Sequence, residues 1–206
     1  MESFNRKNHW ENIYSTKKLN EVGWYQPTPE TSLNFIKELK LPKTASIIDI
    51  GGGDSFLADN LLEIGYQNIS VLDISKKAIE RAKLRLGKKG ENVKWIEAEI
   101  TEFNPTETYD LWHDRAAFHF LTDENEIENY ILSAQKGVSD SGNLIIGTFS
   151  TEGPKKCSGI EIRQYSESTL LNRFTSSFEK IKCLIIDHET PFNTTQNFIF
   201  CGLRKL

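Results

Sequence analysis

The sequence of 206 residues predicts an α/β protein built on a doubly wound, mostly parallel sheet. Three observations predict this fold class. Short apolar runs alternate with helical patterns from Ala45 onward, and a glycine-rich junction connects the first apolar run to its helix. The last two apolar runs lie only about ten residues apart, which is too close for a helical crossover. We therefore expect seven strands, of which the last two form a C-terminal antiparallel hairpin.

Hydrophobic periodicity places the individual elements. Trp10, Ile13 and Tyr14 share one face of a helix expected over about 6–18, and a second helix follows with Leu33, Phe35, Ile36 and Leu39. The expected strands are 45–50, 68–73, 93–97, 109–113, 143–149, 180–187 and 196–204. The expected helices between them are 54–65, 75–87, 122–137 and 166–176, and Ser75 occupies the N-cap position of the second of these.

The length and charge of the chain limit its organisation and its partners. We expect 1–206 to form a single domain, with 1–40 as an N-terminal helical lid segment, because the chain is too short for two ordinary domains. The net charge of -4 provides no general basic field, so neither nucleic acid nor a membrane is expected as a partner. No apolar run approaches the length of a membrane span, and we expect a cytoplasmic protein.

The cysteines and histidines form no metal-binding or disulfide pattern. Cys157, Cys183 and Cys201 are separated by 26 and 18 residues, and we expect all three to be reduced thiols. The four histidines show no H-E-x-x-H or equivalent spacing, and no metal site is expected.

The junction Ile47–Ser55 is the main functional signal. It reads D-x-G-x-G, with Asp49, Gly51 and Gly53 in place. A dinucleotide fingerprint would require glycine at position 56, where Phe56 stands, and a phosphate-binding loop would require a G-K-[ST] ending that is absent. Asp73 ends the next apolar run, 20 residues after Gly53, where an acid can accept hydrogen bonds from both ribose hydroxyls.

This pattern resembles motif I of the class I S-adenosylmethionine (SAM) methyltransferases, which have a Rossmann-like fold. The resemblance implies SAM as the cofactor, with the glycine loop facing its methionine tail. It also implies that Glu99 accepts from the adenine amino group, although Asp is commoner there, and that the backbone of Ile100 meets the ring. The implied cofactor-binding residues are Asp49, Gly51, Gly52, Gly53, Asp73, Ile74, Glu99, Ile100, Asp114 and Arg115.

Three further segments resemble small bacterial methyltransferases related to the elongation-factor lysine methyltransferases. They are Trp24-Tyr25 before the second helix, the D-R-A-x-F-H-F-L run from Asp114, and the G-P-x-K-C-S-G run from Gly153. The resemblance covers about 10–165. The Asn/Asp-Pro-Pro-aromatic tetrapeptide of enzymes that methylate nucleobase or glutamine amides is absent after the fourth strand, which argues against nucleic-acid amino groups as acceptors.

Methyl transfer from a sulfonium requires alignment and a dry cavity, and a base only when the nucleophile arrives protonated. His113, Asp114 and His119 lie at the correct strand end to be that base. Each also has a structural interpretation: a core-facing ring, an ion pair and a turn cap, respectively. The candidate acceptor-binding residues are Trp24, Tyr25, Lys155 and Cys157, although the two aromatic residues serve equally well to pack the N-terminal segment onto the sheet.

The function predicted from the sequence is transfer of a methyl group from SAM to an unidentified small-molecule or protein acceptor. One alternative is a catalytically silent SAM or nucleotide sensor. Another is a nicotinamide-dependent reductase, which is disfavoured because its Y-x-x-x-K pattern occurs only at Tyr14 and Lys18, upstream of the glycine loop. The sequence predicts no oligomeric state.

Overall fold

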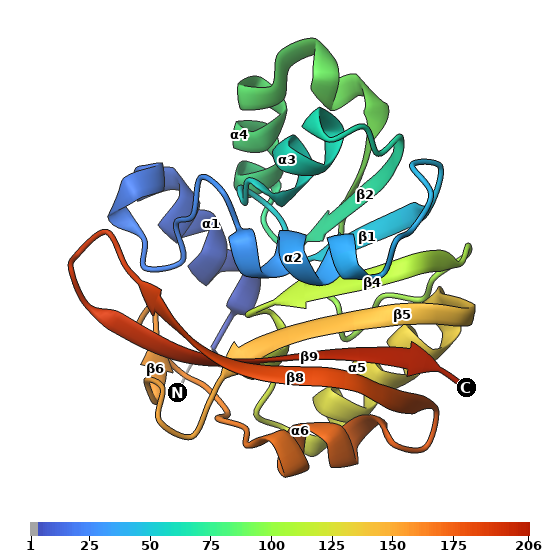
Figure 1. Cartoon of the computed structure of the whole chain (residues 1–206). Helices are drawn as coiled ribbons and strands as arrows, with labels where there is room; N and C mark the ends of the chain where they lie inside the picture. Colours follow the sequence, from blue (N-terminus) through green and yellow to red (C-terminus); the bar gives the residue numbers. More distant parts are fainter. Residues whose placement is uncertain (1–3) are drawn as a thin grey trace.

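A computed structural model describes residues 4–206 and contains the expected seven-stranded sheet, with strand order β3-β2-β1-β4-β5-β9-β8 (Figure 1). The first five strands in this order are parallel, while β9 is antiparallel to β5 and β8 is antiparallel to β9. The predicted fold class, including the C-terminal hairpin, is confirmed. The strands are β1 Ser46–Ile50, β2 Asn68–Asp73, β3 Val93–Glu97, β4 Tyr109–Arg115, β5 Val138–Phe149, β8 Phe178–Glu189 and β9 Thr195–Lys205.

Helices cover both faces of this sheet. The helices are α1 Arg6–Thr16, α2 Glu30–Glu38, α3 Leu57–Glu63, α4 Lys76–Leu86, α5 Glu124–Gly137 and α6 Glu167–Phe174. Residues of α5 and α6 pack into one core cluster around Trp112, and residues of α2 and α3 pack into a second cluster around Phe35. The Ser75 hydroxyl caps α4 as expected, by accepting from the Ala78 amide. A small hairpin of β6 Lys156–Cys157 and β7 Ile160–Glu161 was not predicted.

The N-terminal segment divides into two parts that differ in burial. Helix α2 buries Phe35 and Ile36 in the core, whereas α1 has no buried residue. Helix α2 is therefore part of the core, whereas α1 lies outside it. That 1–40 acts as a lid stays a prediction. Residues 1–3 of that range lie outside the described part of the chain.

The strand order creates a crevice beside β1. The chain moves from β1 outward to β2 and β3, then returns to β4 on the other side of β1. Connections therefore leave β1 and β4 in opposite directions at their carboxyl ends, and this switch point is where open α/β sheets bind ligands.

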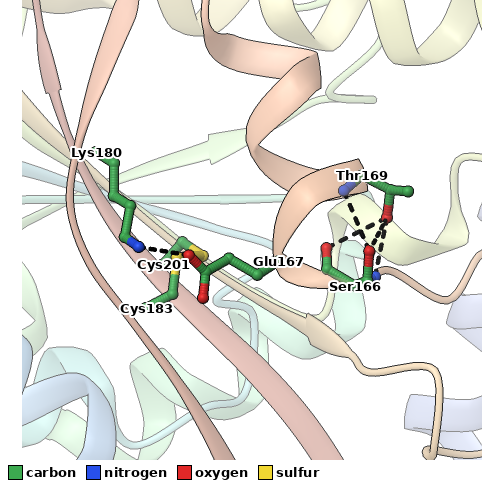
Figure 2. Close-up of a disulfide and its surroundings, with 6 residues drawn as sticks. All are labelled: Ser166, Glu167, Thr169, Lys180, Cys183 and Cys201. Carbon is green, nitrogen blue, oxygen red and sulfur yellow. Dashed lines mark hydrogen bonds and ion pairs between the residues drawn. A yellow bond between two sulfur atoms is a disulfide. The ribbon is translucent and has the colours of Figure 1, made fainter.

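The cysteines differ from the sequence prediction. Cys183 and Cys201 form a disulfide, and Figure 2 shows it between the last two strands, so the expectation of three reduced thiols is wrong for this pair. The antiparallel register of β8 and β9 places the two residues directly opposite each other. Their spacing of 18 residues spans a hairpin, and sequence spacing alone does not reveal this register. Cys157 is free.

Figure 2 also shows how α6 is anchored beside this hairpin. The Ser166 side chain accepts from the Thr169 amide at the start of α6, and Glu167 forms an ion pair with Lys180 of β8. Across residues 4–206, none of the helices combines the length and apolar character needed to cross a bilayer.

Candidate active site

A cavity lies at the carboxyl ends of β1, β2 and β4, at the switch point. It brings together thirteen of the sixteen residues predicted for the site. These are Asp49, Gly51, Gly52, Asp73, Ile74, Glu99, Ile100, His113, Arg115, His119, Trp24, Tyr25 and Cys157. Gly53, Asp114 and Lys155 are not on its wall.

Asp49 braces the glycine loop from below. Its Oδ2 accepts from the Ser55 hydroxyl at 3.2 Å, and its Oδ1 lies 2.7 Å from His113 Nδ1. A Cβ at Gly52 would overlap the Asp49 carboxylate, and Gly51 has a φ of +64°, which a side chain disfavours. The loop therefore requires glycine both for its backbone conformation and for its close approach to Asp49.

His113 connects Asp49, which contacts the glycine loop, to helix α2. Its Nδ1 contacts Asp49, and its Nε2 lies 2.8 Å from the Ser32 hydroxyl of α2. The side chain is buried, and both ring nitrogens are engaged. In the neutral ring, Nδ1 donates to the carboxylate, since a carboxylate only accepts, and Nε2 accepts from Ser32. Neither nitrogen is free to take a proton from a methyl acceptor. The arrangement therefore supports the interpretation of His113 as a core-facing ring.

Asp73 lies at the end of β2, directly beneath the glycine loop. Its Oδ1 accepts from the Ser75 amide at 2.8 Å, and a Cβ at Gly53 would overlap its carboxylate. Burial, with smaller contributions from the carboxylates of Asp49 and Glu11, raises the pKa of Asp73 to about 7. Gly53 thus lets the backbone reach an acid that has no cationic partner among residues 4–206.

Helix α1 is docked onto the start of α4, across the mouth of the cavity. The Glu11 carboxylate accepts from the Lys76 and Lys77 amides at 2.8 and 3.1 Å and from the Ser75 hydroxyl at 3.2 Å. A carboxylate at a helix N-terminus satisfies free amides and complements the helix dipole. This contact holds α1 in the covering position.

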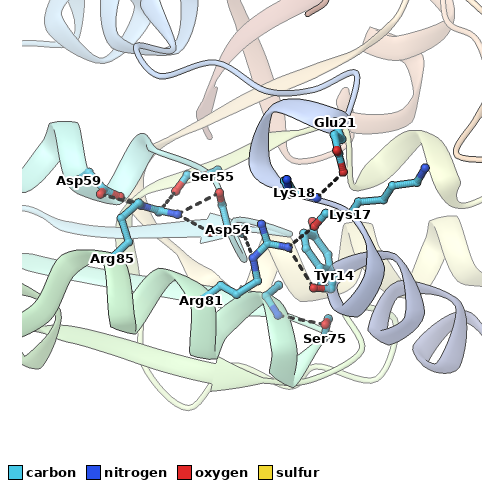
Figure 3. A network of polar contacts seen from close by, with 11 residues as sticks. Tyr14, Lys17, Lys18, Glu21, Asp54, Ser55, Asp59, Ser75, Arg81 and Arg85 are labelled. Atoms are coloured by element: carbon cyan, nitrogen blue, oxygen red, sulfur yellow. Dashed lines mark hydrogen bonds and ion pairs between the residues drawn. The ribbon is translucent and has the colours of Figure 1, made fainter.

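Two arginines of α4 contact the segments on either side of it: Arg81 contacts the end of α1, and Arg85 contacts the residues after the glycine loop (Figure 3). Arg81 donates to the Tyr14 and Lys17 carbonyls at 3.0 and 2.8 Å, and its Nε lies 2.8 Å from Asp54. Arg85 pairs with Asp54 and Asp59. The Asp54 carboxylate, which follows the glycine loop, is therefore shared by two guanidinium groups.

Glu99, the side chain expected to meet adenine, is paired with α1. Arg6 Nη1 lies 3.1 Å from its Oε2, and Arg6 Nη2 lies 2.7 Å from Glu126. One guanidinium thus faces two carboxylates. Arg6 was not predicted from the sequence, because nothing in its local pattern marks a contact 93 residues away.

Asp114 shapes the turn after β4. Its Oδ1 accepts from the Ala117 and Phe118 amides at 2.9 and 3.3 Å, and its Oδ2 accepts from the Tyr130 hydroxyl at 2.7 Å. It is fully buried, and burial raises its pKa to about 7. The turn that it holds contains Ala116 at a φ of +82°, a strained conformation for a residue with a side chain. Because Asp114 is off the cavity wall, these contacts support a structural role.

His119 differs from the other two candidate bases. It lies on the cavity wall, and its Nδ1 accepts from the Phe149 amide at 3.3 Å. Burial, with the nearby positive charge of Arg115, lowers the pKa of His119 to about 3, so the ring is neutral at pH 7. With Nδ1 accepting, the single proton lies on Nε2, which has no hydrogen-bond partner among residues 4–206. The unpartnered nitrogen of His119 is therefore a buried donor at the cavity wall and not a basic nitrogen.

Three of the four residues predicted to bind the methyl acceptor line the cavity, and their binding to an acceptor stays a prediction. Trp24, Tyr25 and Cys157 line the cavity, and burial raises the pKa of the Cys157 thiol to about 11, which keeps it protonated. Lys155 is exposed and outside the cavity. Phe149 of β5 and Phe198 of β9 complete the wall, and the sequence carried no signal for them because they resemble any buried strand residue.

Comparison with known proteins agrees with this geometry. Residues 47–142 match the family described as methyltransferase domain. Over these residues, which are just under half of the chain, the sequence is similar to methyltransferase domains. It is 32% identical over 157 residues to malonyl-[acyl-carrier protein] O-methyltransferase 1 of Ilyobacter polytropus, covering 76% of this chain and 53% of the relative. It is 20% identical to EEF1A lysine methyltransferase 2 of Homo sapiens, covering 85% of this chain and 75% of the relative.

Solved structures of methyltransferases share the fold of this chain. One is the N-methyltransferase NodS from Bradyrhizobium japonicum WM9 in complex with S-adenosyl-L-homocysteine (SAH), with a TM-score of 0.70 and 16% identity, covering 98% of this chain and 99% of that one. The chain spans about half the length of the Ilyobacter relative and 18% of the eEF1A lysine and N-terminal methyltransferase of Mus musculus, which is 29% identical over 60% of this chain. These relatives act on different acceptors, and none of them assigns an acceptor here.

Proposed function

We propose that this chain binds SAM in the cavity at the carboxyl ends of β1, β2 and β4 and transfers its methyl group to an acceptor enclosed beneath α1. The observation that carries this proposal is the glycine loop, which is braced by Asp49 and in direct contact with the buried Asp73. A loop without side chains lies beside a buried acid that has no cationic partner within residues 4–206, and this arrangement fits a ligand with hydroxyl donors and a positive centre.

The residues present fit the cofactor part by part. Asp73 is placed to accept from the ribose hydroxyls, Gly51 and Gly52 leave room for the methionine end, and Ile74, Glu99 and Ile100 are the candidates for the adenine end. When bound, SAM supplies a methyl group on a sulfonium, which is already a good electrophile. Glu99 is free to meet adenine only when it shares or releases Arg6, so the adenine end is coupled to α1.

The protein then contributes alignment and exclusion of water. Trp10 and Trp24 pack edge to face at 5.7 Å between ring centroids and cover the cavity, and Trp10 also packs on Phe120 at 5.0 Å. None of His113, Asp114 and His119 presents a free basic atom to the cavity in this arrangement. We infer that the nucleophile is unprotonated when it binds, or that it loses its proton to solvent, and that displacement proceeds in line.

The cover over the cavity favours a small acceptor. A protein side chain would have to enter past α1, which is held by Glu11, Arg6 and Arg81. A small molecule needs only a transient opening. A protein acceptor is the second possibility, because EEF1A lysine methyltransferase 2 matches most of this chain.

Titration calorimetry with SAH tests the proposal. The wild type is expected to bind SAH, and Asp73→Ala is expected to weaken binding about ten- to hundredfold, since the loss of a charge-assisted pair costs about 1.5–3 kcal/mol. Asp140→Ala serves as a matched control, because that carboxylate is fully exposed and remote from the cavity. Failure of the folded wild type to bind SAH refutes the proposal. SAH binding without radiolabelled methyl transfer to any fraction of a lysate would instead identify a silent sensor.

A further inference from the structure

Arg115 lines the cavity as a cation without a carboxylate partner in the described part of the chain. Its Nη1 donates to the Trp24 carbonyl at 2.9 Å, and its guanidinium lies 5.3 Å from the ring centroid of Phe198. Among residues 4–206 it has no carboxylate within ion-pair distance. Burial lowers the pKa of Arg115 to about 10, and it remains charged at pH 7.

Arg115 differs from the other partly buried arginines of the chain in lacking a carboxylate partner among residues 4–206. Each has at least one carboxylate partner within residues 4–206: these are Arg6, Arg81, Arg85, Arg163 and Arg173. The carboxylate whose charge acts most strongly on Arg115 is that of Asp49. Its two oxygens already contact His113 and Ser55. A half-buried guanidinium without a partner is costly, and an anion in the cavity would offset that cost.

His119 provides a second, independent observation. Its Nε2 carries a proton, is buried, and has no partner among residues 4–206. The charge of Arg115 contributes to the lowered pKa of the His119 ring. Two aromatic rings connect the two donors. His119 and Phe149 have centroids 4.5 Å apart, and Phe149 and Phe198 have centroids 4.7 Å apart. The wall from Arg115 to His119 therefore combines two donors with two apolar rings.

A carboxylate is the anion that this wall fits, and it has two possible sources: the methionine end of SAM or the acceptor. The position of Arg115 favours the acceptor. Its guanidinium reaches Phe198 on β9, which is separated from β1 and its glycine loop by β4 and β5. Building on the proposed function, we propose that Arg115 and His119 bind the carboxylate of a small methyl acceptor whose apolar or aromatic body packs on Phe149 and Phe198.

Binding of paired probes to the SAH-saturated wild type tests this without any variant. The probes are benzoate, phenylacetate and indole-3-acetate, each compared with its neutral primary amide by calorimetry. We expect at least one carboxylate to bind ten times or more tightly than its amide, and added salt to weaken that binding. Equal affinity within each pair, or no binding across all three pairs, overturns the proposal.

Variants then locate the interaction. Arg115→Met is expected to lower carboxylate affinity at least tenfold and to leave amide affinity unchanged, while Arg115→Lys retains part of the preference. Lys89→Met removes one exposed positive charge outside the cavity and is expected to change neither. His119→Phe is expected to cause a smaller loss than Arg115→Met, since it removes a neutral donor.

The same variants identify the source of the carboxylate. SAH carries the methionine carboxylate, whereas 5′-methylthioadenosine lacks it. We expect Arg115→Met to change the affinity for both ligands less than twofold, which also shows that the variant folds. A tenfold loss for SAH alone would assign Arg115 to the cofactor and overturn the acceptor assignment. Lack of SAH binding by the wild type would refute the proposed function separately.

Discussion

The raised pKa of Asp73 predicts that adenosine binding strengthens as pH rises from 6 to 8. The carboxyl group is buried at the end of β2, and burial raises its pKa to about 7. Below that pH the group is protonated and is a poorer acceptor for two ribose hydroxyls. Above that pH the carboxylate accepts both, so a ligand with these hydroxyls selects the ionised form.

The magnitude follows from the ionised fraction. With a pKa near 7, about one Asp73 in eleven is ionised at pH 6 and about ten in eleven at pH 8. If the ionised form binds, the apparent affinity rises about tenfold over this range, which is about 1.4 kcal/mol. The predicted proton release on binding is close to one per molecule at pH 6 and close to none at pH 8.

Calorimetry with 5′-methylthioadenosine measures this effect cleanly, because that ligand has neither an amine nor a carboxylate that titrates. Titrations at pH 6, 7 and 8 in two buffers of different ionisation enthalpy give both affinity and proton release. Asp73→Asn is expected to bind weakly and without pH dependence, whereas Asp140→Asn, which alters an exposed carboxylate, is expected to behave as wild type. A wild-type affinity constant within twofold from pH 6 to 8 would refute the reasoning.

Three further outcomes are expected. Gly53→Ala should weaken SAH binding more than tenfold, because the new Cβ would overlap the Asp73 carboxylate and lie 2.8 Å from Ala78 Cβ. A wild-type affinity measured by calorimetry would contradict this. SAH should protect residues 10–26 from hydrogen exchange, and Glu11→Gln should speed that exchange because it loosens α1. Equal exchange with and without SAH would mean that these residues only pack against the sheet. Burial raises the pKa of Asp114 to about 7, so its stabilising contribution is present below pH 4 and lost as pH rises to about 7. Asp114→Asn should therefore lose less unfolding free energy than wild type between pH 4.5 and 7.5 in urea titrations, by about 3 kcal/mol, and parallel pH profiles would exclude this.

The fold and the grouping of the glycine loop with the strand-end acids were predictable because their signals are local. The alternation of apolar runs, the D-x-G-x-G junction and the acid that ends β2 each depend on residues close together in the chain. The carboxyl ends of parallel strands share one edge of a sheet, so local spacing suffices to bring Gly51, Asp73 and Glu99 to one cavity. The hairpin was predictable for a similar reason, since a short connection excludes a crossover.

The roles of individual side chains at that edge depended on partners distant in sequence. The sequence placed His113, Asp114 and His119 at the end of the fourth strand. In the structure, His113 contacts Ser32 and Asp49, and Asp114 accepts from Tyr130. The Phe149 amide donates to Nδ1 of His119 and so decides which of its nitrogens carries the proton. Spacing does not encode such contacts, because hydrogen bonding depends on atom positions within a few tenths of an ångström.

Sequence alone therefore determined that this chain builds a class I fold with a glycine loop and an acid at the end of β2. Tertiary structure decided three other properties. The register of β8 and β9 pairs Cys183 with Cys201, and α1 closes over the cavity through Glu11. Arg115 lies over the Phe198 ring and has no carboxylate partner within residues 4–206. The physical reason is the same in each case: periodicity and spacing specify elements and their ends, whereas pairing, burial and charge compensation arise only when elements far apart in the chain pack together.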